Sequence, residues 1–142
     1  MELLIEKRPA SVTEFQDLRS TTGWAMHSAD VVEKALAKDL FTICISYQNQ
    51  LIGVGRIIGD GAMYFYIQDI IVRPEFKGKG IGKIIMNAIE KYLNTHTYKN
   101  SFIGLMAADG VKEFYKKFGY SERDENKPGM FKVITTDYKN QV

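Results

Sequence analysis

Glycines and lysines alternate near the middle of the chain, in the run from Lys77 to Lys83 (KGKGIGK). Glycine has no Cβ, so the backbone can approach a ligand closely at Gly78, Gly80 and Gly82. Where such a loop opens a helix, backbone N–H groups point outward and the helix dipole favours negative charge. The lysines add positive charge around the same point. The run therefore predicts a cradle for a pyrophosphate group.

The segments on either side of this run predict a strand before it and a helix after it. The stretch Tyr64 to Val72 is β-branched and aromatic without Gly or Pro, which indicates a strand, and Pro74 ends it because proline lacks an N–H donor. Apolar residues then recur at helical spacing from Ile81 to Leu93, so an amphipathic helix is expected to begin near Gly80. This order supplies the helix N-terminus that an anion site uses.

Two common phosphate-binding motifs do not fit the spacing of the glycines. A Walker loop has a hydroxyl residue after its Gly-Lys pair, whereas Ile84 follows Lys83 here. The dinucleotide fingerprint is G-x-G-x-x-G, whereas Gly78, Gly80 and Gly82 are spaced G-x-G-x-G, and no strand with an acidic tip follows about twenty residues on. A nucleotide-binding module of another kind and a Gly-rich surface turn without function remain as alternatives.

The segment Lys77 to Gly82 resembles the Q/R-x-x-G-x-G/A motif of the GCN5-related N-acetyltransferases (the GNAT superfamily), which cradle the pyrophosphate of acetyl-CoA. Lys77 stands where Gln or Arg is usual, but the backbone contacts do not depend on that side chain. The run Phe114 to Tyr120 (FYKKFGY) resembles the C-terminal signature of the same superfamily. Within it, the chain looks like the small bacterial members of undefined acceptor.

The resemblance implies which residues bind and activate the coenzyme. Tyr115 corresponds to the tyrosine that acts as general acid for the departing thiolate, and the Ile70 N–H corresponds to the donor that polarises the thioester carbonyl. Asp109 stands near the position where an Asn often contacts pantetheine. The implied coenzyme-binding set is Ile70, Ile71, Val72, Lys77, Gly78, Lys79, Gly80, Ile81, Gly82, Lys83, Asp109 and Tyr115. On spacing alone, the helix that carries Tyr115 is also consistent with an ordinary core stripe.

The resemblance also implies an acceptor site, which lies in this fold beneath a helix–loop–helix near the N-terminus. The implied residues are Arg19, Trp24, Met26, His27, Tyr66, Gln68 and Phe131. Trp24 fits either a plug between two helices or a wall of the acceptor pocket. The aromatic residues suit an apolar or aromatic amine better than a polyamine, which would require several carboxylates.

A general base for the amine is not evident. Superfamily bases often occupy the positions of Tyr66 and Gln68 as Glu or His, and neither residue present here is a good base. Asp69 is either that base or a hydrogen-bonded sheet residue, and a water chain or an amine that binds neutral are further routes. Strand alternation places Gln68 and Ile70 on one face and Asp69 on the other, unless a bulge changes the phase.

The whole chain is expected to form one GNAT domain over residues 1–142, with the order β-α-α-β-β-β-α-β-α-β-β. This is an α/β fold with a mixed, mostly antiparallel central sheet of about six or seven strands and about four flanking helices. The remaining predicted strands are Leu3–Lys7, Phe41–Tyr47, Leu51–Ile58, Asn100–Met106, Tyr120–Arg123 and Met130–Thr136. The remaining predicted helices are Val12–Ser20, Asp30–Lys38 and Gly110–Phe118. The apolar strand Asn100–Met106 is expected to be buried on both faces and to lie parallel to Tyr64–Val72, splayed from it.

Composition and charge argue against several kinds of partner and site. The chain has 142 residues and 45% hydrophobic content, which is enough for a proper core. Its net charge of +2 gives no sign of a nucleic-acid partner. One cysteine and two histidines do not make a metal site, so no metal is expected. No apolar run is long enough for a membrane span and no signal peptide is evident, so a cytoplasmic location is expected. A homodimer is kept as an expectation because C2 dimers are the commonest oligomers.

These observations predict an acetyl-CoA-dependent N-acetyltransferase that acts on a primary amine of a small molecule or peptide. We expect direct transfer in a ternary complex, because Cys44 lies on a strand away from the loop and does not suit an acyl-cysteine intermediate. One alternative is a non-catalytic acyl-CoA sensor. Another is an acetyltransferase that acts on a protein N-terminus or lysine.

Overall fold

The structure is a computed structural model that describes residues 1–136. The chain divides into two compact units, one from Met1 to Ala108 and one that begins at Asp109. The expectation of a single domain over residues 1–142 stays a prediction.

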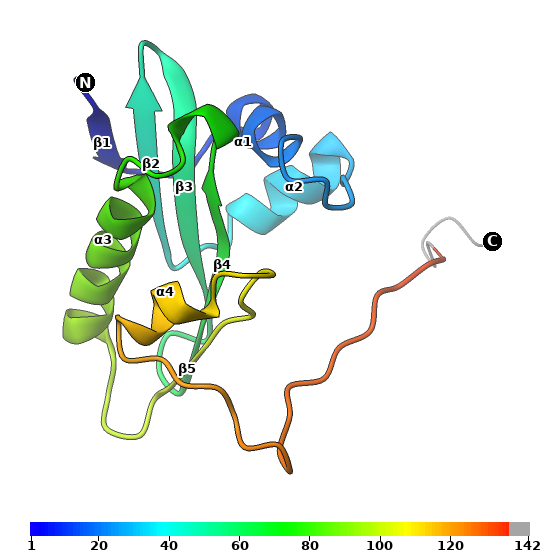
Figure 1. Ribbon diagram of the computed structural model, residues 1–142. Coiled ribbons are helices and arrows are strands. Elements are labelled where there is room, and N and C mark those ends of the chain that lie inside the picture. Colours follow the sequence, from blue (N-terminus) through cyan, green and yellow to red (C-terminus); the bar gives the residue numbers. More distant parts are fainter. Residues whose placement is uncertain (137–142) are drawn as a thin grey trace. The chain divides into compact units, whose positions relative to one another are not determined.

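A five-stranded sheet forms the centre of the first unit, in the order β1-β2-β3-β4-β5 (Figure 1). The first four strands are antiparallel neighbours, and β5 runs parallel to β4. The strands are β1 Leu4–Lys7, β2 Phe41–Tyr47, β3 Gln50–Gly59, β4 Tyr64–Val72 and β5 Phe102–Gly104. The helices are α1 Val12–Arg19, α2 Ala29–Leu36, the 3₁₀ turn η1 Pro74–Phe76 and α3 Ile81–His96, and the second unit contains α4 Lys112–Lys116.

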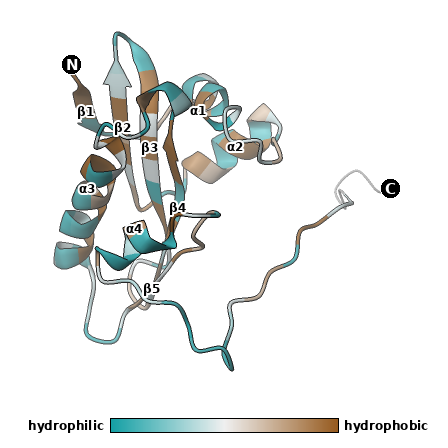
Figure 2. Ribbon diagram, in the orientation of Figure 1, coloured by the Kyte–Doolittle hydropathy of each residue, from teal (hydrophilic) through white to brown (hydrophobic). Residues whose placement is uncertain are grey.

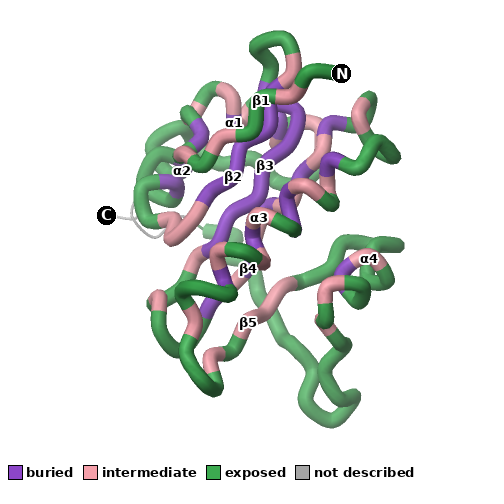
Figure 3. Tube along the Cα trace, turned by 90° about the vertical axis from the view of Figure 1, so that its left-hand side faces the viewer, coloured by how far each residue is buried: buried purple, intermediate pink, exposed green. Residues whose placement is uncertain are grey.

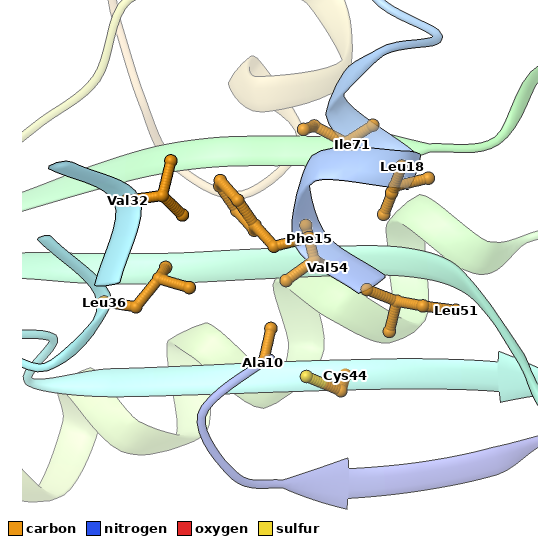
Figure 4. Packing of buried hydrophobic residues seen from close by; sticks show 9 residues of the cluster. All are labelled: Ala10, Phe15, Leu18, Val32, Leu36, Cys44, Leu51, Val54 and Ile71. Atoms are coloured by element: carbon orange, nitrogen blue, oxygen red, sulfur yellow. The ribbon is translucent and has the colours of Figure 1, made fainter. Parts of the chain in front are cut away.

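Helices α1 and α2 cover one face of the sheet (Figure 4). Serines cap both helices, since the Ser11 hydroxyl accepts from the Glu14 N–H and the Ser28 hydroxyl accepts from the Val31 N–H. Their apolar stripes then meet apolar residues of β2, β3 and β4. The resulting cluster contains Ala10, Phe15, Leu18, Val32, Leu36, Cys44, Leu51, Val54 and Ile71.

Helix α3 packs on the opposite face of the sheet, and its apolar residues point inward while hydrophilic residues line its outer side (Figure 2). Gly53 and Gly55 of β3 allow this helix to approach closely. A Cβ built on Gly55 would lie 2.5 Å from Ile85 Cγ2, 2.9 Å from Ile70 Cδ1 and 3.0 Å from Ile89 Cδ1. The sheet is therefore buried on both faces along β2 and β3 (Figure 3).

Most predicted elements of the first unit are confirmed, with β2 and β4 at the predicted bounds. The prediction of a long strand buried on both faces over Asn100–Met106 is wrong, because β5 is short and Phe102 is 49% exposed. Within the described residues β5 has a neighbour on one side only, so it is an edge strand. An apolar run shows that a segment can enter a sheet but not how many neighbours it will have.

The final pair of strands, predicted over Tyr120–Arg123 and Met130–Thr136, is also absent, because residues 120–136 contain no strand. Met130 and Phe131 are 87% and 79% exposed. The residues of this segment favour a strand, but within the described part of the chain no other strand pairs with them. The predicted helix Gly110–Phe118 is shorter than expected, since α4 covers Lys112–Lys116. The described sheet therefore has five strands and not six or seven, while the α/β architecture with four α-helices is confirmed.

No helix in residues 1–136 is both long enough and apolar enough to cross a membrane.

Replacing Gly55 by Ala tests the close approach of α3. The added methyl group would be forced against three isoleucine side chains, so we expect a loss of about 1–3 kcal/mol in the free energy of unfolding. Chemical denaturation measures it. The matched control is Gly129→Ala, where a Cβ meets nothing within 4 Å. Equal stability of the two variants would contradict the packing described here.

Candidate functional site

The glycine-rich loop connects η1 to α3. Gly78 and Gly80 have φ angles of +77° and +82°, in the left-handed region that favours glycine. A Cβ built on either residue would meet no protein atom within 4 Å, so the space beside both glycines is open. The loop is thus shaped for a close approach from outside the protein, and not for packing against it.

The N-terminus of α3 is open as well. Gly80 is its N-cap and makes no side-chain capping hydrogen bond. The N–H of Ile84 donates to the Gly80 carbonyl at 3.1 Å, so the N–H groups of Ile81, Gly82 and Lys83 precede the first hydrogen bond of the helix. Ile81 is buried and fixes the start of the helix, whereas the three lysines of the loop are exposed. Unbonded N–H donors beside positive charge are the features with which a helix N-terminus binds an anion.

Arg73 holds this loop to the rest of the first unit. Its backbone N–H donates to the Ile52 carbonyl at 2.7 Å. Its buried guanidinium donates to the Leu51 carbonyl at 3.1 Å and to the Asp17 carboxylate of α1 at 2.6 Å. The role of Arg73 was not predicted, although a charged residue directly before the strand-ending Pro74 was the available signal.

Strand β4 parts from β5 after a short contact, as predicted. The parallel ladder contains only the pairs Tyr64–Phe102, Phe65–Ile103 and Tyr66–Gly104, while β4 continues to Val72. Beyond Tyr66, the edge of β4 therefore has no ladder with β5. Ile70, Ile71 and Val72, which were predicted to contact the coenzyme, all lie on this open stretch.

A β-bulge interrupts β4 within the open stretch. Val54 pairs with Ile71 and Arg56 pairs with Gln68, so Gly55 alone stands opposite both Asp69 and Ile70, and neither has a partner in the β3–β4 ladder. Asp69 has a φ of +52°, which is uncommon for a residue other than glycine. Such a bulge frees backbone groups from the ladder.

The bulge overturns the predicted alternation around Asp69. The Asp69 carboxylate accepts from Gln68 Nε2 at 3.2 Å and is paired with Arg19 of α1, so both side chains lie on the α1/α2 face of the sheet. Ile70 turns to the α3 face, where its Cδ1 lies near Gly55. The expectation that Gln68 and Ile70 share a face opposite Asp69 is therefore wrong, because one extra residue shifts the phase of the strand.

The Asp69 carboxylate is buried and is paired with two guanidinium groups. It lies 2.6 Å from Arg56 Nη1 and 3.4 Å from Arg19 Nη1. Arg56 is also paired with Asp39 at 2.8 Å. Hydrogen bonds and charges from both carboxylates outweigh the effect of burial and raise the pKa of Arg56. This geometry favours the interpretation of Asp69 as a hydrogen-bonded sheet residue over that of a free base.

Arg19 connects this carboxylate to the loop between α1 and α2. Its guanidinium lies 5.5 Å from the centre of the Trp24 ring and donates to the Ala25 carbonyl at 3.2 Å. Trp24 is 41% exposed, so it is not a plug buried between the helices. The His27 carbonyl accepts from Gln16 Nε2 at 2.7 Å, which ties the loop to α1.

The structure therefore brings several predicted acceptor residues to the α1/α2 face of the first unit. Arg19 contacts both Asp69 and Trp24, and Gln68 contacts Asp69. Tyr66 lies on the same face two residues earlier, and its partial burial raises the pKa of its phenol. Met26 and His27 are exposed on the loop, and Phe131 belongs to the second unit, where it is exposed.

In the second unit, Tyr115 is buried while most of its helix is not. The Tyr115 ring packs edge-on against Phe114, with ring centres 5.2 Å apart. Burial raises the pKa of the Tyr115 phenol, so the group stays protonated at neutral pH. Val111 is exposed and Phe118 is half-buried, which argues against an ordinary buried stripe along this helix. Asp109 is exposed at the start of this unit.

Cys44 lies in the core between β2 and the α1/α2 layer, where its Sγ is 3.5 Å from the Arg8 carbonyl. Burial raises the pKa of the thiol to about 11. A buried neutral thiol is a poor nucleophile.

Comparison with known proteins identifies the family. Residues 10–134 match the acetyltransferase (GNAT) domain. The uncharacterized N-acetyltransferase ycf52 of Porphyra purpurea is 30% identical over 122 residues, which are 83% of this chain and 69% of that protein. A crystal structure of a probable acetyltransferase of unknown function from meticillin-resistant Staphylococcus aureus has a TM-score of 0.88 at 28% identity, covering 94% of this chain and 100% of that one. A GNAT-family acetyltransferase from Streptococcus pneumoniae has a TM-score of 0.76 at 23% identity, over 95% of this chain and 100% of that one.

The mixed sheet with its parted β4 and β5 thus defines an acetyltransferase fold. The chain belongs to the GNAT superfamily and is an N-acetyltransferase of that family. The family implies an acyl-CoA cosubstrate, and the open glycine loop at the α3 N-terminus fits the phosphates of such a molecule.

The chemistry of Cys44 can be tested directly. With a pKa of about 11, about 0.1% of the native thiol is ionised at pH 8, compared with about a quarter of an unperturbed thiol. We therefore expect a thiol reagent to label the native protein at least about 100-fold more slowly than the denatured protein. Rapid labelling of the native protein at pH 8 would show that the thiol is accessible, and it would support a mechanism through an acyl-cysteine intermediate.

Proposed function

We propose that this protein transfers an acetyl group from acetyl-CoA to a primary amine of a small molecule or peptide, by direct attack in a ternary complex. The observation that carries the proposal is the open loop at Gly78 and Gly80, which precedes the uncapped N-terminus of α3. The loop lies shortly after β4 in the chain, separated from it by η1, and the edge of β4 beyond Tyr66 has no ladder with β5. A pyrophosphate site and a free strand edge are the two features that a pantetheine-bearing ligand needs.

In this proposal the loop binds the coenzyme through its backbone. The N–H groups from Gly78 to Lys83 hold the pyrophosphate, and the exposed lysines of the loop neutralise its charge. The peptide groups of Ile71 and Val72 pair with the pantetheine arm as a strand would. Lys77 contributes charge at a position where the family more often has Gln or Arg. Asp109, at the start of the second unit, is assigned to the same arm.

The chemical step uses two donors. The Ile70 N–H, freed from the ladder by the bulge, donates to the carbonyl oxygen of the thioester while the amine nitrogen bonds to the carbonyl carbon. The Tyr115 phenol donates its proton to the sulfur as the C–S bond breaks, and water returns a proton to Tyr115. The raised pKa of Tyr115 supports this role, since the phenol is protonated at neutral pH. The excess proton of the amine leaves to water.

The acceptor is proposed to lie over the α1/α2 face, bounded by Arg19, Trp24, Met26, His27, Tyr66 and Gln68, with Phe131 as a further contact. The aromatic rings of Trp24 and Tyr66 supply apolar area. Asp69 is the only carboxylate between Tyr66 and Val72, and two guanidinium groups already engage it. This supports an apolar or aromatic amine over a polyamine.

The pairing of Asp69 with two arginines also supports a second candidate function, a non-catalytic acyl-CoA sensor. A sensor needs the cradle but no base, and the carboxylate of this segment is not free to act as one. An acceptor that is a protein N-terminus or lysine is a variant of the first proposal, and the exposed Trp24 loop is compatible with it. A homodimer remains a prediction.

Calorimetric titration with acetyl-CoA, CoA, ATP and NAD tests the cradle. We expect binding of acetyl-CoA and CoA only, and loss of this binding in Gly80→Asp, because the new side chain enters the open space beside the loop and repels phosphate. The control is Gly80→Ala, which carries the same backbone strain without the charge. Unaltered binding in Gly80→Asp, or selective binding of ATP, would refute the proposal. An amine panel with thiol release as readout then separates an enzyme from a sensor.

Replacing Tyr115 by Phe tests the general acid. Removing the hydroxyl alone should lower kcat by about 10² to 10⁴ and leave the acetyl-CoA affinity within about twofold, since the ring packing on Phe114 is retained. Stopped-flow turnover and calorimetry measure the two quantities separately. An equal loss of turnover and affinity would make Tyr115 a structural residue, and the neighbouring Phe114→Leu provides the packing control.

A further inference from the structure

A buried charge network lies directly behind the β4 bulge. Arg56 of β3 is 7% exposed, and its Nη1 donates to the Asp69 carboxylate at 2.6 Å. Its Nε and Nη2 donate to the Asp39 carboxylate at 3.0 Å and 2.8 Å. Asp39 lies between α2 and β2 and also accepts from the Thr42 hydroxyl at 2.7 Å. One guanidinium thus joins the bulge to a carboxylate in the connection between α2 and β2.

The backbone at the bulge is held in an unfavourable conformation. Asp69 has a φ of +52°, although glycine would adopt this angle more easily. Aspartate tolerates the left-handed region better than most residues, but tolerance alone does not fix it there. The carboxylate that this conformation turns toward Arg56 is 2.6 Å from the guanidinium, so the ion pair compensates for the strained angle.

The opposite face of the bulge is supported by packing. Gly55, which stands opposite Asp69 and Ile70, leaves room for the Ile70 side chain beside Ile85 and Ile89 of α3. The bulge is therefore fixed by charge on one face and by van der Waals contact on the other. With both faces constrained, the peptide between Asp69 and Ile70 has a single orientation, and that peptide carries the Ile70 N–H.

We propose that Arg56, together with Asp39, locks the Asp69 bulge so that the Ile70 N–H is aimed at the thioester carbonyl. Asp69 is then a positioning residue and not the general base. The inference rests on the proposed function for the role of the Ile70 N–H, while the lock itself is a property of the free protein. Arg19 takes a smaller part, because its Nη1 is 3.4 Å from Asp69 and its buried Nε has no hydrogen-bond partner among the described residues.

Backbone nitrogen-15 relaxation of Ile70, measured by NMR in the ligand-free protein, tests the lock without any substrate. In the wild type we expect an order parameter near that of rigid backbone, about 0.85, and in Asp69→Ala and Arg56→Lys a fall below about 0.6, because each removes hydrogen bonds that hold the bulge. The order parameter of Ile45, in the centre of β2, should not change. Arg56→Lys keeps the buried positive charge, so it remains informative if Asp69→Ala does not fold. An unchanged Ile70 order parameter in both variants would overturn the lock.

The infrared carbonyl stretch of bound acetyl-CoA, labelled with carbon-13 at the carbonyl, tests the consequence. Donation from Ile70 should lower this frequency in the wild type, and the lowering should disappear in Asp69→Ala. Asp69→Asn should keep most of it, because asparagine also tolerates a positive φ and still accepts from Arg56. The control is Asp60→Asn, which changes a hairpin carboxylate away from the bulge and should have no effect.

Turnover of the same variants separates a positioning role from a base. The lock predicts that Asp69→Asn keeps more than about a tenth of wild-type kcat, while Asp69→Ala loses about 10² or more, the effect of removing one oxyanion donor. Equal loss in both variants with an unaltered carbonyl frequency would make Asp69 the base and overturn the inference. Failure of the wild type to bind acetyl-CoA would refute the proposed function, while the Ile70 order parameters would still decide the lock.

Discussion

The parallel ladder between β4 and β5 is short, and the proposed coenzyme site depends on the free edge of β4 that this leaves. Three residue pairs join β4 to β5, and from Ile67 onward the edge of β4 is open. An open strand edge carries backbone donors and acceptors that need partners. The bulge at Asp69 lies within this stretch and releases Ile70 from the other ladder as well. The sheet thus leaves backbone groups of β4 without ladder partners shortly before the glycine-rich loop.

The two faces of the sheet are supported in different ways. On the α3 side, Gly53 and Gly55 let the helix pack directly on the sheet, so the loop at the start of α3 begins from a rigid base. On the α1/α2 side, a large apolar cluster surrounds a few buried charges that are all paired, among them Arg56 and Asp69. Buried charges are tolerated when they are paired and hydrogen-bonded, as these are. Arg73 adds a further buried link, between the loop and α1.

Local pattern determined much of this architecture. The β-branched composition of Phe41–Tyr47 and Tyr64–Val72 predicted β2 and β4 at their observed bounds, and the apolar spacing after Gly80 predicted the start of α3. The glycines were predicted to form a loop that opens a helix, and the positive φ angles of Gly78 and Gly80 show that glycine suits these two positions best. These features depend on residues close together in the sequence, since propensity, turn chemistry and helical spacing are local properties.

Only the tertiary structure decided the phase of β4 at Asp69, the partners of its carboxylate and the short edge strand β5. Bulges and ion pairs depend on residues brought together from distant parts of the chain, such as Asp39, Arg56 and Asp69. The periodicity of one strand does not determine the register in which it pairs with its neighbour. The C-terminal residues 120–136 make the same point, because their apolar side chains favour a strand but a strand also requires a partner. The sequence by itself determined most elements of the first unit and the glycine-rich loop that opens α3, and long-range pairing decided which backbone groups of β4 stay free.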